Sequence, residues 1–512
     1  MKLETFFEKF EQFAEAPNAV KKLRGLVLEW GATGKLCHNQ SVEWKEGVLG
    51  DVIELISGQH LLANEHNFEG RGIPYLTGPS DFGEKHPIPT RWSDQPKVTA
   101  QPGDILITVK GSGVGKTNVL VDQPTAISRQ LMAIRVTGAD PEFVYVVVKR
   151  AAEHFQNSKT GIAIPGIGRK EVLGLKVVLP PLAEQKRIVA KVDGLMALCD
   201  RLEAQQQERD TRHAALASAA LARFADAPTP ANQDFLFHTS YAIAPADLRK
   251  TILTLAVQGK LVPQDPNDEL AVNMLVKIEA EKKRLSDCGE LKADKKAWVG
   301  ASFNPPHDIP ETWCWTRLQD VFEISRGGSP RPAGDSRYFG GSIPWITVGE
   351  ITKDSTKYLT ETATGLTEEG AKRSRFINSW DLLLTNSGAT LGVPKISKIR
   401  GCMNDGVAVL RLFHSFDLND FAYLYLVHQT PAFRSVNQGM GQPNLNTPII
   451  AGWFFPLPPI AEQRRIVAKV DQLMALVDLL ETQLADSRAA AINLMEAVVA
   501  ELTLQGVKHA DS

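Results

Sequence analysis

The segment Lys110–Thr117 (KGSGVGKT) comes closest in the sequence to a nucleotide-binding loop. Such a loop, G-x-x-x-x-G-K-[ST], cradles phosphates with backbone N–H groups and its lysine. Its first glycine would have to stand at position 110, which is Lys110. The comparable later segment, Asn386–Pro394, lacks the Lys-Thr pair altogether. We therefore interpret Lys110–Thr117 as a polar, glycine-rich loop at a strand end and expect no nucleotide site there.

Other patterns that could support catalysis or metal binding are also incomplete. Methyl transfer to a base amine needs an Asn/Asp-Pro-Pro-aromatic motif, and Asn304-Pro-Pro-His307 lacks both the aromatic residue and a second copy. The five cysteines lie far apart, without a CxxC pair, which argues against a zinc site or a disulfide framework. We expect no catalytic residue, no bound cofactor and no metal ligand in this chain.

Polar loop residues instead suit the recognition of nucleic acid. Arg and Lys can read guanine, and Asn and Gln adenine, by paired hydrogen bonds in the major groove. The alternative is that Gly, Asn and Ser are simply turn formers. In the stretch 42–178 the candidates are Ser57, Gln59, His60, Lys110, Ser112, Lys116, Arg129, Gln130 and Lys159. In the stretch 311–456 they are Arg326, Ser329, Arg331, Asn386, Ser387, Asn404, Asn437, Gln438, Gln442 and Asn444.

An internal repeat organises the whole chain. Residues 179–205 and 457–483 match without gaps at 21 of 27 positions. A second shared element, Leu-Arg followed by Gly-Lys-Leu, begins at Leu23 and again at Leu248 with equal spacing. Weaker matches link the stretches between them, which we call the first head (42–178) and the second head (311–456). The order is therefore a short helical segment, a variable head and a long helix, repeated once.

The long segments after each Leu-Pro-Pro have a helical period. Apolar residues recur at steps of four and three, which is typical of a coiled coil, and the prolines place each helix start just after them. We expect the two helices to pair with each other, antiparallel. The run Ile188–Ala220 would span on the order of 48 Å, more than one turn of B-DNA at about 34–36 Å. The predicted seam consists of Ile188, Val192, Leu195, Cys199, Leu202, Ile466, Val470, Leu473, Val477, Leu480 and Leu484.

The heads alternate short β-rich runs with Gly, Pro, Asn and Ser loops, and each holds one expected helix, near 141–156 and 417–435. The sequence predicts an α+β fold, with two mixed heads separated by an antiparallel coiled coil in a pseudo-twofold repeat. The predicted parts are 1–41 (helical), 42–178 (head), 179–225 (long helix), 226–310 (helical segment with a charged, partly helical insertion), 311–456 (head) and 457–512 (long helix).

The net charge and the distribution of apolar residues limit the possible functions of the chain. A formal net charge of −2 is awkward for a DNA-binding protein, because phosphate contacts favour a basic surface. The N-terminus carries acidic residues where a signal peptide would be apolar, and no apolar run is long enough for a membrane span. We expect a cytoplasmic protein that does not bind membranes.

The doubled Leu-Pro-Pro-(Leu/Ile)-Ala-Glu-Gln-(Lys/Arg)-Arg-Ile-Val helix start resembles the specificity subunit of type I restriction–modification systems. The Leu-Arg…Gly-Lys-Leu segments and Pro310-Glu-Thr-Trp-Cys-Trp resemble it too, so the likeness covers nearly the whole chain. The longer charged segment between Leu261 and Trp313 departs from the family pattern.

The resemblance implies that each head is a target recognition domain for one half of a split, asymmetric DNA sequence, with the helices setting the spacer. It implies partnership with double-stranded DNA, two methyltransferase subunits and two restriction (translocase-nuclease) subunits. S-adenosylmethionine, ATP and Mg would be used by those partners. Two alternatives stay open from the residues: a nucleotide hydrolase or self-contained methyltransferase, which needs the missing motifs, and a coiled-coil dimerisation protein, which has no need of two divergent heads.

Overall fold

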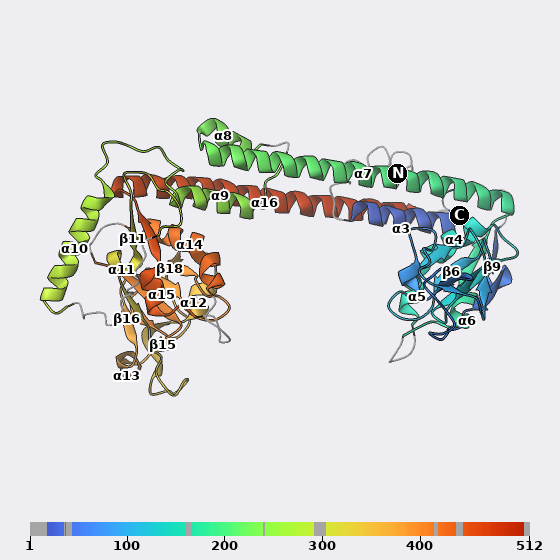
Figure 1. The fold of residues 1–512 in the computed structure, drawn as a ribbon, viewed down its shortest axis with the longest axis horizontal. Helices are drawn as coiled ribbons and strands as arrows, with labels where there is room; N and C mark the ends of the chain where they lie inside the picture. The colour runs from blue at the N-terminus through green and yellow to red at the C-terminus, as the bar shows by residue number, and fades with distance from the viewer. Residues whose placement is uncertain are drawn as a thin grey trace. The chain divides into compact units, whose positions relative to one another are not determined.

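The computed structural model describes residues 18–34, 36, 44–159, 165–238, 241–290, 304–413, 418–436 and 444–505. The chain forms two compact units, which are described separately here. The first unit comprises Met1–Asp210 with Asp486–Ser512, and the second comprises Thr211–Ala485. The chain passes between them twice, within the two long helices α7 (Leu182–Asp226) and α16 (Ile460–Gln505) (Figure 1).

The first unit contains the first head, a mixed structure of small sheets and helices. One sheet has the order β2-β9-β6-β7 and the other β4-β3-β8-β5, while β1 and β10 form an antiparallel pair. The strands are β1 (Lys45–Val48), β2 (Ile53–Ser57), β3 (Ile73–Leu76), β4 (Trp92–Ser93), β5 (Thr99–Ala100), β6 (Ile105–Thr108), β7 (Thr117–Val119), β8 (Thr125–Ile127), β9 (Leu131–Val136) and β10 (Lys176–Leu179). The helices are α3 (Ala19–Ala32), η1 (Leu49–Asp51), η2 (Pro79–Asp81), α4 (Pro141–Arg150), α5 (Ala152–Asn157) and α6 (Arg169–Leu173).

The second unit contains the second head. Its sheets have the orders β12-β20-β17-β18-β14 and β15-β13-β19-β16, with β11 paired to β21. The strands are β11 (Cys314–Arg317), β12 (Phe322–Arg326), β13 (Phe339–Ile346), β14 (Tyr358–Leu359), β15 (Gly365–Leu366), β16 (Arg375–Ile377), β17 (Leu382–Thr385), β18 (Pro394–Ser397), β19 (Gly401–Met403), β20 (Val407–Leu412) and β21 (Phe454–Leu457). The helices are α8 (Pro230–Leu236), α9 (Pro245–Val257), α10 (Ala271–Asp287), α11 (Leu318–Val321), α12 (Val348–Thr352), α13 (Glu368–Lys372), α14 (Asn419–Ser435) and α15 (Thr447–Gly452).

The two heads share one frame. The order β2-β9-β6-β7 in the first corresponds to β12-β20-β17-β18 in the second, with the same antiparallel pairings. The same ion pair joins the two central strands in each: Arg135 lies 2.9 Å from Asp104, and Arg411 lies 2.7 Å from Asp381. The predicted α+β class with two mixed heads and two long helices is confirmed.

The predicted seam identifies the buried faces of the long helices, and these faces pack on short helices as well. Ile188, Val192 and Cys199 are buried in the first unit's cluster, together with Leu23, Val27 and Trp30 of α3 and with residues of the first head. In the second unit, Ile466, Val470, Leu473 and Val477 are buried in a cluster with Leu248, Ile252 and Leu255 of α9. Among the described residues, the start of each long helix therefore packs on the short helix of its own unit, and the second unit's cluster also holds Ala220 and Phe224 of α7. The period of a helix reveals which face is apolar, but not what covers that face.

An arginine clamp fixes each short helix on its long helix. Arg24 of α3 lies 2.6 Å from Asp200 and 2.7 Å from Glu203 on α7. Arg249 of α9 lies 2.7 Å from Asp478 and 2.6 Å from Glu481 on α16. The acidic residues are offset by the 278 positions of the repeat, so the structure reproduces the sequence duplication contact by contact.

The far ends of the long helices pack differently from their beginnings. In the first unit, Met495 of α16 is buried against Ala19 of α3. In the second unit, Phe224 near the end of α7 is fully buried in the main cluster. Each unit thus contains the start of one long helix and the end of the other. No helix in the described part of the chain is long and apolar enough to cross a membrane.

Candidate nucleic-acid interface

Strand direction brings the candidate loops of the first head to one edge of its main sheet. β2 and β6 both pair antiparallel with β9, so they run parallel to each other and end on the same side. At that side β2 leads into Gln59 and His60, β6 leads into Lys110, and the turn at Arg129 and Gln130 leads into β9. We call the loops 57–60, 109–116 and 128–130 the first polar edge.

Backbone hydrogen bonds hold these loops together. The N–H of Gln59 donates to Ile127 O (2.9 Å), and the N–H of Val109 donates to Gln130 O (2.8 Å). The N–H of Ile167 then donates to Val109 O (2.9 Å), which brings the segment before α6 to the same edge. The side chains at the tips are therefore carried on a fixed backbone, which is what a recognition surface requires.

The second head builds the same edge from its own loops. β12 and β17 both pair antiparallel with β20, so Arg326, Asn386 and the turn before Val407 meet on one side. The N–H of Asn386 donates to Gly406 O (2.9 Å), and the N–H of Leu445 donates to Asn386 O (2.8 Å). We call the loops 326–331, 386–393 and 404–406 the second polar edge.

A glycine is required at one point of each edge. A Cβ on Gly58 would lie 2.2 Å from the backbone oxygen of Ser128, and a Cβ on Gly327 would lie 2.0 Å from that of Asn404. Real Cβ atoms do not approach a backbone oxygen so closely, so only glycine lets the first loop reach the turn before β9 or β20.

On the first polar edge most of the predicted residues are exposed. Two of the first head's candidates are half-buried: Ser57, whose hydroxyl accepts a hydrogen bond from Arg169 (3.2 Å), and Lys159, whose ammonium donates to Gln156 (2.5 Å). Lys116 also lines a hollow of about 280 Å³ with Lys149 of α4. The exposed candidates are Gln59, His60, Lys110, Ser112, Lys116, Arg129 and Gln130.

On the second polar edge the predicted residues are less exposed. Only Arg331 of the described candidates is exposed, while Arg326, Ser329, Ser387, Asn404 and Asn444 are half-buried. Asn386 is 1% exposed, so its side chain lies beneath the edge and not on it, because the backbone of residue 386 is held between two neighbouring loops. Asn437, Gln438 and Gln442 lie outside the described residues.

Sequence reasoning missed two charged residues at these edges. Arg169, the first residue of α6, is exposed and donates to Leu55 O (2.6 Å) beside the first polar edge. Asp405 of the second edge accepts from the hydroxyl of Ser329 (2.6 Å), and its carbonyl accepts from Arg326 (2.5 Å). Neither belongs to a motif, and only the folded sheets bring them to the edge.

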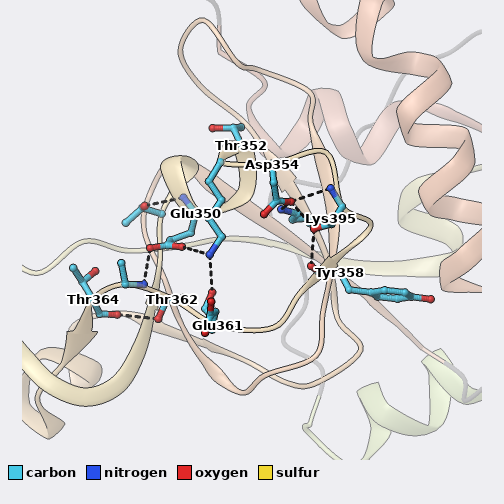
Figure 2. A network of polar contacts seen from close by, with 12 residues as sticks. Glu350, Thr352, Asp354, Tyr358, Glu361, Thr362, Thr364 and Lys395 are labelled. Carbon is cyan, nitrogen blue, oxygen red and sulfur yellow. Dashed lines mark hydrogen bonds and ion pairs between the residues drawn. The ribbon is translucent and has the colours of Figure 1, made fainter. Parts of the chain in front are cut away.

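Figure 2 shows a polar network that holds the segment after α12 against β18 of the second head. Lys395 of β18 is 1% exposed, and its Nζ lies 2.6 Å from Oδ1 of Asp354. The Lys395 ammonium, helped by hydrogen bonds from Thr356, holds the pKa of Asp354 well below its usual range. Glu350 accepts from the N–H of Ala363 (2.8 Å) and lies 3.2 Å from Lys353. Because β18 begins at the second polar edge, the network stabilises the frame behind that edge.

The described residues show no group of three or more His, Cys, Asp or Glu side chains that could hold a metal ion. The cysteines in the described part are all free, and burial raises the pKa of the Cys199 and Cys402 thiols. These thiols are therefore held in the neutral form, which is neither a strong nucleophile nor a metal ligand.

A family model and the similar proteins of known function name the same family. The model of the type I restriction modification DNA specificity domain matches residues 41–209 and 310–486. The type I restriction enzyme EcoAI specificity subunit of Escherichia coli is 27% identical over 76% of this chain and 67% of its own length. The EcoBI specificity subunit of the same species is 22% identical over 94% and 90%. A solved structure describing complex assembly and conformational transition of the type I R-M system contains a chain that is 20% identical. It aligns with a TM-score of 0.49 over 90% of this chain and 98% of that chain.

Proposed function

Since the chain belongs to the type I restriction–modification DNA specificity family, and is thus a non-catalytic subunit that recognises a DNA sequence, we propose that each head reads one half of a bipartite, asymmetric target. The first polar edge would read one half-site and the second polar edge the other. The exposed polar side chains of each polar edge would contact base edges and phosphates.

One observation carries this proposal: the same edge is built twice on one frame, with different side chains. The strands, the required glycine and the central Asp–Arg ion pair recur in both heads. The side chains at the loop tips do not recur. A constant frame with variable tips is what two independent sequence readers need, whereas a purely structural repeat would not need its surface to vary.

The long helices would set the spacing between the half-sites. α7 has 45 residues and α16 has 46, and each begins in one unit and ends in the other. Such helices must run in opposite directions, which supports an antiparallel spacer. A helix of this length spans about 68 Å at 1.5 Å per residue, enough to separate two major-groove contacts by more than one turn of DNA.

The catalytic work would belong to partner subunits. In this proposal two methyltransferase subunits bind along the helices and supply the S-adenosylmethionine site, and two restriction subunits supply the sites for ATP and Mg. The complex would assemble in the cytoplasm. Partners that enclose the DNA would also provide basic surface, which accounts for a specificity subunit with a net charge of only −2.

The direct test is to express this chain with its methyltransferase partner in a host without other methylases and to map the methylated bases of the genome. We expect methylation at one bipartite sequence with two dissimilar halves and a spacer of fixed length. Methylation at a single continuous motif, or none above the level of the methyltransferase alone, would contradict the proposal.

A further inference from the structure

The two polar edges can be matched position by position through their hydrogen bonds. An isolated β-bridge joins Lys110 to Gly166 in the first head and Ser387 to Asn444 in the second, so Lys110 corresponds to Ser387. The N–H of Thr108 donates to Lys116 O, and that of Thr385 donates to Val393 O. Lys116 therefore corresponds to Val393.

Two further positions match in the same way. The N–H of Ser128 donates to Leu76 O, as that of Asn404 does to Ile346 O, so the residues that follow, Arg129 and Asp405, correspond. α6 and α15 each begin after an N-cap residue, so Arg169 corresponds to Thr447, and the next pair is Lys170 and Pro448.

The matched positions differ sharply in charge. The first head has five cations there, Lys110, Lys116, Arg129, Arg169 and Lys170, and all five are exposed. The second head has no cation at any of them and has the anion Asp405 in place of Arg129.

The second polar edge has two cations of its own, Arg326 and Arg331. Arg326 is half-buried and donates to the carbonyl of Asp405, and Arg331 lies 3.8 Å from the Asp405 carboxylate. The Asp405 carboxylate therefore offsets part of the attraction of Arg331 for a phosphate, while Arg326 is half-buried and has already donated one N–H within the protein. By contrast, Lys110, Lys116 and Arg129 form no ion pair within the described residues.

We propose that the two heads bind DNA by different physical means: the first anchors the complex through ionic phosphate contacts at Lys110, Lys116 and Arg129, whereas the second binds through mainly neutral hydrogen bonds. This inference rests on the proposed DNA-reading role of the heads. It assigns the sequence-independent share of the affinity to the first half-site.

The consequence is measurable because ionic contacts release counterions. The observed affinity falls with salt with a log–log slope of about −0.9 for each phosphate neutralised in duplex DNA. Two lost contacts would reduce the slope by about 1.8, which between 50 and 200 mM salt is a difference on the order of tenfold in affinity. Neutral hydrogen bonds contribute little to that slope.

The test uses the full-length chain in complex with its methyltransferase subunits, bound to a duplex of about 30 base pairs without the target sequence, across a range of NaCl concentrations. The double variant K110S/K116V introduces the second head's residues into the first. The control K45S/K176V removes two exposed lysines from the β1–β10 pair and so changes the net charge equally. The reciprocal variant S387K/V393K introduces the first head's residues into the second.

We expect K110S/K116V to reduce the salt slope by about 1.8, S387K/V393K to increase it, and the control to leave it near the wild-type value. A slope for K110S/K116V equal to that of wild type or of the control would overturn the proposal. If that variant fails to assemble, Arg129→Gln is the second test, with an expected reduction of about 0.9. Failure of the wild-type complex to bind any duplex at low salt would refute the proposed function itself.

Discussion

Removing one buried side chain from α16 tests the packing of α9 on its apolar face. Leu473 is fully buried in the cluster that contains Leu248, Ile252 and Leu255 of α9. Truncating such a leucine to alanine typically costs about 2–5 kcal/mol, and full enclosure places Leu473→Ala in the upper part of that range, about 3–5 kcal/mol. Leu479, on the same helix, is 55% exposed, so Leu479→Ala is a matched control with an expected cost within about 0.5 kcal/mol.

Hydrogen exchange resolved along the chain is the suitable assay, because the two units need not unfold together. A loss of 3 kcal/mol corresponds to an increase of about 150-fold in the open population. We therefore expect the amides of α9 to exchange at least about 100-fold faster in Leu473→Ala and to be nearly unchanged in Leu479→Ala. Equal exchange of α9 in the two variants would refute the packing of α16 against α9.

Three further predictions follow from single features. Gly327→Ala would place a Cβ within 2.0 Å of Asn404 O and should weaken DNA binding at least about tenfold. Gly194→Ala, whose Cβ would meet nothing within 4 Å, should leave DNA binding unchanged. Equal DNA affinities of the two variants would contradict the close approach at Gly327. Inserting one heptad into both α7 and α16 should lengthen the spacer in the methylated sequence and leave both halves unchanged; an unchanged spacer would refute the ruler. Burial of His428 of α14 against α9 lowers its pKa below the ordinary 6.5, so the unfolded chain takes up the proton first. The free energy of unfolding of the second unit, measured in urea, should therefore fall as the pH drops below about 6.5. His428→Asn should weaken this pH dependence. A pH dependence equal to that of the wild type would contradict the role of His428.

Much of the fold could be predicted from local sequence. Prolines before the repeated helices placed their starts close to Leu182 and Ile460, where α7 and α16 begin. The helix predicted near 417–435 is α14, and the one predicted near 141–156 is covered by α4 and α5. These elements are set by turn formers and by the spacing of apolar residues, both of which are visible along the chain.

The packing of the short helices on these apolar faces could not be predicted in the same way. Val192 and Val470 repeat at helical spacing, and nothing in that spacing distinguishes a second long helix from the short helices α3 and α9. The repeated Leu-Arg…Gly-Lys-Leu element is evident in the sequence, but its pattern does not show what its arginine contacts. In the structure, Arg24 and Arg249 pair with acidic residues of α7 and α16.

The sequence predicts which polar residues lie in the loops of each head, but not how those loops come together in the two polar edges. Lys110 and Arg129 were selected because they stand in loops, and the parallel course of β2 and β6 is what brings those loops together. Asp405 was missed because an isolated aspartate in a turn has no motif. The DNA contacts of individual residues stay predictions.

The central claim, that each head reads one half-site independently, is tested most directly by replacing the first head. Residues 42–178 would be exchanged for the corresponding head of a relative, with α7 and α16 intact, and the methylated sequence mapped with the same methyltransferase partner. We predict that one half of the target changes while the other half and the spacer stay the same. A change in both halves would contradict the account.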